Sequence, residues 1–146
     1  MTPETLRQRL PHTGSMVLID QVLSYDQTQL KARSQAHQRT DNPLRTRTGL
    51  PASAALEMAA QAAALHGSLR AGAPDPKPGF LASAREIRWS QPAFDPASSE
   101  IQIEVEWLAS EPQGALYRFT VTSAPKMRVE GRFMIHFPEP SPPIDA

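Results

Sequence analysis

The segment from Ala52 to His66 constrains the fold more than any other part of the chain. Eight of its fifteen residues are alanine, and no glycine occurs before Gly67. Alanine is the strongest helix former, so the segment predicts a helix from Pro51 to about Leu69. Its small side chains allow neighbouring strands to approach the helix backbone closely, which fits a helix wrapped by a curved sheet.

The rest of the chain reads as short elements separated by proline and glycine. A helix of about two turns is expected between Thr2 and Pro11, where Pro3 suits the first helical position. Strands are expected over 16–25 and 29–36 before the long helix, and over 79–90, 100–110, 115–123 and 126–137 after it. Residues 37–50 and 71–78 lack periodicity and predict loops. Closely spaced strands pair antiparallel, so the sequence predicts an α+β fold with a four-strand meander after the helix.

Composition bounds the classes of protein that this chain can represent. Its 146 residues form one domain, which we place at 1–137, followed by a proline-rich tail over 138–146 that we expect to be disordered. The 15 basic and 15 acidic residues balance, so no overall field favours nucleic acid or an anionic membrane. The absence of cysteine excludes disulfides, a thiolate nucleophile and cysteine metal sites. No export signal or membrane span is recognisable, so we expect a cytoplasmic protein.

Three polar residues of the long helix, Ser53, Glu57 and Gln61, are spaced four apart and share one stripe. The simplest interpretation is that the stripe is the solvent face of an amphipathic helix. However, Glu57 is the only charged residue between Ala52 and Leu69, whereas an exposed face usually also carries lysine or arginine. A single carboxyl group among apolar side chains is the alternative, a candidate general acid.

The four histidines are His12, His37, His66 and His136. They form no His-x-x-x-His pair, so we expect no metal site. His12 stands in a turn before Gly14, and the residues alone leave a structural role and a catalytic role equally open. We expect structural roles for His37 and His66, because His66 falls on the opposite face of the helix from Glu57.

Three segments together carry a resemblance to a known family. The stretch Glu57-Met58-Ala59-Ala60-Gln61 resembles the Glu-x-Met-Ala-Gln helix of the hotdog-fold 3-hydroxyacyl-acyl carrier protein dehydratases, with Met58 and Ala59 in exchanged order. The segment from Leu10 to Asp20 resembles the family's Leu-Pro-His start, and residues 87–96 resemble its strand and proline-rich turn. The Pro-His-x-Gly-x-Met start and Asn42-Pro43-Leu44 are most similar to the aryl-polyene-type branch.

The resemblance implies a hotdog fold, in which an antiparallel sheet wraps the central helix and two subunits pair their sheets. It implies the removal of water from a 3-hydroxyacyl thioester on an acyl carrier protein, as in fatty-acid or aryl-polyene biosynthesis, with no cofactor. A histidine takes the proton alpha to the carbonyl, and the helix carboxyl group, here Glu57, protonates the departing hydroxyl. Backbone N–H groups near Leu50 and Ser53 polarise the carbonyl, and Gln61 hydrogen-bonds beside the acid.

The resemblance fails at one point. The common form of the family carries a histidine in a His-Phe-Pro-Gly loop before the helix, whereas the corresponding residues 41–47 contain none. Either His12 replaces it as the base, or this chain is a non-catalytic partner of a second hotdog subunit that supplies the histidine. A hotdog thioesterase, in which Glu57 activates water, is a third alternative.

Residues 31–47 carry five basic side chains and one acidic side chain, a net charge of 5 − 1 = +4. An ordinary solvated surface explains this charge as well as a docking site does. If the segment is functional, it binds the acidic acyl carrier protein or the phosphate of its pantetheine arm. Arg45 and Arg47 are the preferred residues, because they precede the long helix.

Overall fold

The computed structural model describes residues 17–47, 49–71, 80–112 and 114–136. The expected N-terminal helix, most of the linker and the C-terminal tail lie outside them. Within these ranges, one helix, α2 (Ala54–Ala71), accompanies eight strands. The strands are β1 (Gln21–Tyr25), β2 (Gln29–Ser34), β3 (Leu50–Pro51), β4 (Phe80–Trp89), β5 (Ala93–Phe94), β6 (Ile101–Glu111), β7 (Gly114–Ser123) and β8 (Met127–His136). The predicted α+β class is confirmed.

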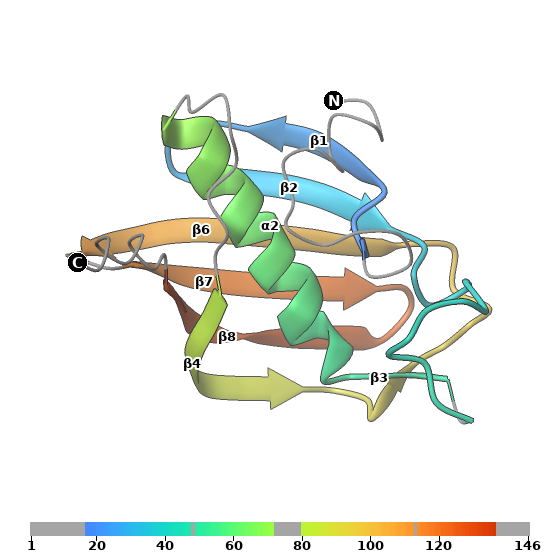
Figure 1. The fold of residues 1–146 in the computed structure, drawn as a ribbon. Coiled ribbons are helices and arrows are strands. Elements are labelled where there is room, and N and C mark those ends of the chain that lie inside the picture. Colours follow the sequence, from blue (N-terminus) through green and yellow to red (C-terminus); the bar gives the residue numbers. More distant parts are fainter. Residues whose placement is uncertain (1–16, 48, 72–79, 113, 137–146) are drawn as a thin grey trace, which may run out of the picture.

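Six strands form one antiparallel sheet in the order β1-β2-β6-β7-β8-β4, and β3 pairs with β5 separately. Helix α2 crosses one face of the large sheet diagonally, from its start near β3 to its end beside β1 and β2 (Figure 1). No helix among the described residues has the length and apolar character needed to span a membrane.

The predicted four-strand meander is correct for β6, β7 and β8 but wrong for β4, which pairs with β8 at the far edge of the sheet. β6 pairs instead with β2, because both strands alternate buried and exposed residues in matching register. Leu30, Ala32 and Ser34 lie opposite Val105, Ile103 and Ile101, and all six are buried. β4 has no such alternation and is largely exposed, as an edge strand can be.

The long helix begins at Ala54 and not at the predicted Pro51. Leu50 and Pro51 form β3 opposite Phe94 and Ala93, and the N–H of Ala52 donates to the Pro92 carbonyl at 2.8 Å. Tertiary pairing therefore delays the helix by three residues. The first strand is likewise shorter than predicted, since β1 begins at Gln21 rather than Met16.

The core lies between α2 and the inner face of the sheet. Tyr117, Phe119 and Phe133 are buried and form a ring cluster, with Phe133 at 6.1 Å from Tyr117 and 5.3 Å from Phe119 between ring centroids. Met58 and Leu65 of α2 are also fully buried. The alanines of the helix from Ala54 to Ala64 are buried as well, which confirms that the sheet packs closely around it.

Candidate functional site

The polar stripe on α2 is not a solvent face. Ser53, just before the helix, is exposed and Glu57 is half-buried, but Gln61 is only 1% exposed. The stripe therefore runs from the surface into the interior of the protein. A buried side-chain amide requires hydrogen-bond partners, so polar groups must surround Gln61. This result overturns the simplest interpretation of the sequence pattern.

Gln61 connects Glu57 to the segment that precedes β1. Its Nε2 donates to Glu57 Oε1 at 3.4 Å, and its Oε1 accepts from the Leu18 N–H at 2.9 Å. The same amide therefore orients the helix carboxylate and holds the backbone of Leu18 against the helix. The sequence predicted Gln61 as a hydrogen-bond partner beside the acid, and the structure places it there.

Side chains hold the backbone of Val17 and Leu18, and the Asp20 N–H donates to the Arg33 carbonyl of β2 at 3.0 Å. Arg39 Nη2 donates to the Val17 carbonyl at 2.8 Å, and Ser34 Oγ donates to the Leu18 carbonyl. The Gln35 N–H donates to Asp20 Oδ2 at 2.6 Å. The sequence grouped Arg39 with a basic surface and missed this contact, because a bond across 22 residues leaves no local pattern.

His12 lies outside the described residues, six positions before Leu18. The first two residues that the structure describes, Val17 and Leu18, are hydrogen-bonded to Arg39 and Gln61 respectively. His12 therefore stays a predicted base.

The start of α2 offers fewer backbone donors than predicted. Leu50 is fully buried in β3, and the N–H of Ala52 is bonded to Pro92. The next two N–H groups, those of Ser53 and Ala54, find no backbone acceptor within the described residues. Because the first N–H groups of a helix are free of intrahelical partners, these two are the candidate donors to a substrate oxygen.

The two buried histidines are both engaged away from Glu57. His37 Nε2 donates to the Ser98 carbonyl at 2.9 Å. His66 Nε2 donates to the Asp26 carbonyl at 2.8 Å, and its Nδ1 accepts from the Tyr117 hydroxyl at 2.7 Å. The structural roles predicted for both residues agree with this geometry, and neither imidazole has a nitrogen directed to Glu57 by a hydrogen bond.

Burial lowers the pKa of His66, and the Arg70 charge lowers it further, while the bond to the Asp26 carbonyl opposes both. Burial also raises the pKa of Tyr117, which keeps its hydroxyl a donor. In the neutral imidazole both ring nitrogens have a hydrogen-bond partner. In an imidazolium both nitrogens carry protons, so neither can accept from the Tyr117 hydroxyl. The pair therefore joins α2, β7 and the β1–β2 turn through a neutral histidine.

This pair predicts a pH dependence of stability. The pKa of His66 is lower in the folded state than the unfolded value near 6.5, so the unfolded chain binds more protons. The contribution of neutral His66 to the free energy of unfolding is complete above the unfolded pKa. It is lost as the pH falls below that pKa, by at most about 1.4 kcal/mol per pH unit. Urea denaturation of wild type and His66→Gln at several pH values measures this slope. Equal slopes for the two proteins between pH 6.5 and 5 contradict the assignment.

The remaining predicted residues lie apart from this hydrogen-bond chain. Arg45 is half-buried and Arg47 is exposed, both in the loop between β2 and β3, and neither forms an ion pair with a described residue. His136 ends β8, opposite Phe80. Across the described ranges, no group of three or more metal-binding side chains occurs.

Comparison with known proteins gives a family. A model of the ApeP-like family, described as ApeP dehydratase, matches residues 4–143. A search of curated proteins finds no match.

Solved structures share the fold at low sequence identity. The dehydratase heterocomplex ApeI:P from Xenorhabdus doucetiae has a TM-score of 0.80 at 24% identity, covering 92% of this chain and 91% of the other. An HP0420 homologue from Helicobacter felis has a TM-score of 0.64 at 13% identity, covering 95% of this chain and 91% of the other. Thioesterase superfamily member 2 from Mus musculus gives 0.56 at 18% identity, covering 81% of each chain. These similarities confirm the hotdog fold.

Proposed function

Since this chain belongs to the ApeP-like family of dehydratases, we propose that it is a subunit of a hotdog enzyme that removes water from a 3-hydroxyacyl thioester. The substrate is carried by an acyl carrier protein, and the product is the trans-2-enoyl thioester. No metal or soluble cofactor takes part in the proposed reaction.

The proposed reaction is an acid–base elimination. A histidine removes the proton alpha to the carbonyl, and the electron pair forms the new double bond as the bond to the 3-hydroxyl breaks. Glu57, as the carboxylic acid, gives its proton to the departing oxygen, so that water leaves. The N–H groups of Ser53 and Ala54 are suited to the thioester oxygen while it carries negative charge.

The observation that carries the proposal is the chain of contacts from Glu57 through Gln61 to Leu18. A half-buried carboxyl group at one helical position is oriented by an amide one turn along, and the same amide fixes the segment that leads to His12. Glu57 is thus linked through Gln61 to Leu18, six residues after His12, and this link supports the proposed pairing of the two residues.

A second subunit is part of the proposal because β4 is exposed at the sheet edge. Phe80, Leu81 and Trp89 are 55%, 39% and 61% exposed, which is unusual for large apolar side chains in one strand. β4 pairs with β8 on one side, and no described strand covers its other side. An open edge with apolar side chains favours the addition of a partner strand.

A non-catalytic partner role is the second candidate. It is favoured because the buried histidines of the described chain, His37 and His66, are engaged elsewhere. In that role the catalytic histidine belongs to the second subunit and Glu57 affects only stability or assembly. In either role, Arg45 and Arg47 are proposed to bind the acyl carrier protein or its pantetheine phosphate.

The proposal is tested by mass spectrometry of the thioester after incubation of a 3-hydroxyacyl-acyl carrier protein with the purified chain. Loss of one water, giving the enoyl thioester, is expected from the chain alone if its own site is complete, and otherwise only after a second hotdog subunit is added. Release of the free acid identifies a thioesterase instead. An unchanged substrate rules out a self-sufficient site for that acyl group and favours the partner role, which is then tested by adding a second hotdog subunit.

A further inference from the structure

We propose that arginines on β4 and its neighbours reject a second copy of this chain and select a hotdog subunit whose edge strand carries carboxylates. The inference rests on the proposed pairing of two subunits through β4, and it adds which partner that edge accepts. Its basis is a row of like charges on the outer face of the sheet, the face away from α2.

Three arginines stand side by side across three strands. Arg118 of β7 lies directly opposite Arg132 of β8, and Arg132 lies directly opposite Arg85 of β4. All three are exposed. Directly opposed residues share one face of a sheet, and like charges in such pairs destabilise the pairing. The row therefore ends in a positive charge at the open edge.

Acidic residues of β6 and β4 pair with the two inner arginines of the row, but no described acidic residue pairs with an arginine of β4. Arg118 pairs with Glu106 and Arg132 pairs with Glu86, each at 3.7 Å. Neither Arg85 nor Arg88 of β4 forms an ion pair with a described residue. β4 therefore carries two arginines without an ion pair to a described residue, while its own carboxylate, Glu86, is engaged by Arg132 of β8.

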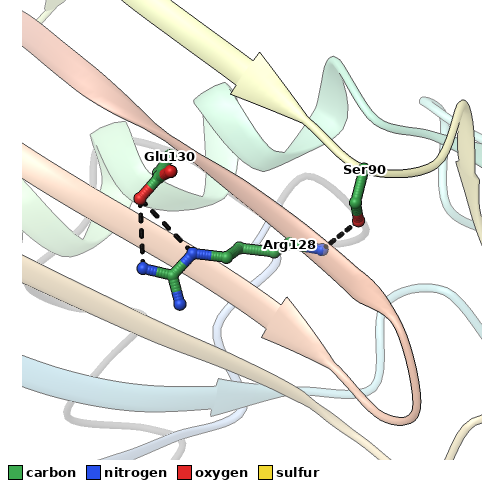
Figure 2. Close-up of polar contacts among 3 residues, drawn as sticks. All are labelled: Ser90, Arg128 and Glu130. Carbon is green, nitrogen blue, oxygen red and sulfur yellow. Dashed lines mark hydrogen bonds and ion pairs between the residues drawn. The ribbon is translucent and has the colours of Figure 1, made fainter.

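Glu130 lies opposite Arg88 in the register, but its carboxylate is engaged by Arg128 of the same strand. Arg128 Nη2 and Nε approach Glu130 Oε2 at 3.0 and 3.3 Å, as Figure 2 shows. The same residue's N–H donates to Ser90 Oγ at 2.8 Å, just beyond the end of β4. Glu130 is the one carboxylate of β8 on this face, and it forms no ion pair with Arg88 of the edge strand.

If β4 pairs with β4 of a second copy, the arginines of the two copies face each other. In an antiparallel pair related by a two-fold axis, outward side chains of one edge strand face outward side chains of its copy. The outward residues here are Ser83, Arg85 and Arg88, opposite Met134, Arg132 and Glu130. When Arg85 meets its copy, the row grows to six arginines, three from each chain. A partner with Asp or Glu at the facing positions ends the row with opposite charge.

The experiment uses the full chain and a charge-reversed copy of it as the acidic partner. The probe is Arg85→Glu combined with Arg88→Glu. Native mass spectrometry and light scattering measure mass for wild type, for the variant and for their equal mixture. We expect each protein alone to be mainly monomeric at low salt and the mixture to form a one-to-one dimer, with a dissociation constant at least about tenfold lower than that of wild type alone. High salt should reduce this difference between the two dissociation constants, because ions screen exposed charges.

A matched control reverses two outward charges away from the edge. Lys31→Glu with Arg33→Glu makes the same change in net charge on β2, and we expect no dimer with wild type. A wild-type homodimer that is equally tight at low and high salt contradicts the inference, as does a mixture that stays monomeric. The salt series on wild type decides the matter even if the variant fails to fold. Because mass is the readout, the inference is separable from the activity: loss of the proposed dehydration leaves the mass result unchanged.

Discussion

Replacing Glu57 by Gln is expected to reduce the dehydration of a 3-hydroxyacyl-acyl carrier protein by about 10²–10⁴-fold, the usual contribution of one general acid or base. Glutamine keeps the size of the side chain and can still contact Gln61, but it has no acidic proton for the departing hydroxyl. The measurement is the rate of enoyl thioester formation, in the same preparation in which wild type is active. Glu104→Gln, on the outer face of β6, is the matched control and should retain full activity.

The thermal midpoint of Glu57→Gln should stay within a few degrees of wild type. His12→Ala should lower the rate to a similar extent if His12 is the base, and should leave it unchanged if the partner subunit provides the histidine. Activity that survives in Glu57→Gln contradicts the proposed role of the carboxyl group and favours the non-catalytic partner role.

The largest effect on stability is expected from Phe133→Ala. Phe133 is 1% exposed and joins Tyr117 and Phe119 in the ring cluster beneath α2. Truncating a buried phenylalanine removes apolar burial and leaves a cavity, and the free energy of unfolding should fall by about 3–5 kcal/mol. Urea denaturation followed by far-UV circular dichroism measures the change.

The neighbouring Met134 provides a control on the same strand, because its side chain lies on the outer face and is half-buried. Met134→Ala should lower the free energy of unfolding much less than Phe133→Ala does. Similar losses for the two variants would show that the ring cluster is not the centre of the core.

Much of the fold was predictable because its pattern is local. The alanine-rich segment marks the helix, and the alternation in β2, β6 and β7 marks strands, since one face of each is buried. The two-residue strands β3 and β5 were missed, because their pairing depends on contact between Leu50 and Phe94, which are far apart in the chain.

The site was only partly predictable for the same reason. Helical spacing by itself placed Glu57 and Gln61 on one stripe, one turn apart. The contacts that turn this stripe into a site, from Gln61 to Leu18 and from Arg39 to Val17, join residues 43 and 22 positions apart. No period in the sequence encodes such contacts.

The sequence by itself determined the class of fold, the helix with its carboxyl group and the resemblance to hotdog dehydratases, because periodicity and short motifs are properties of neighbouring residues. Only the tertiary structure decided that Gln61 is buried against Leu18, that β4 occupies the sheet edge and that its arginines face outward in a row. These features depend on which strands pair and in what register. Register is set by the burial of whole faces at once, and that is a property of the assembled chain.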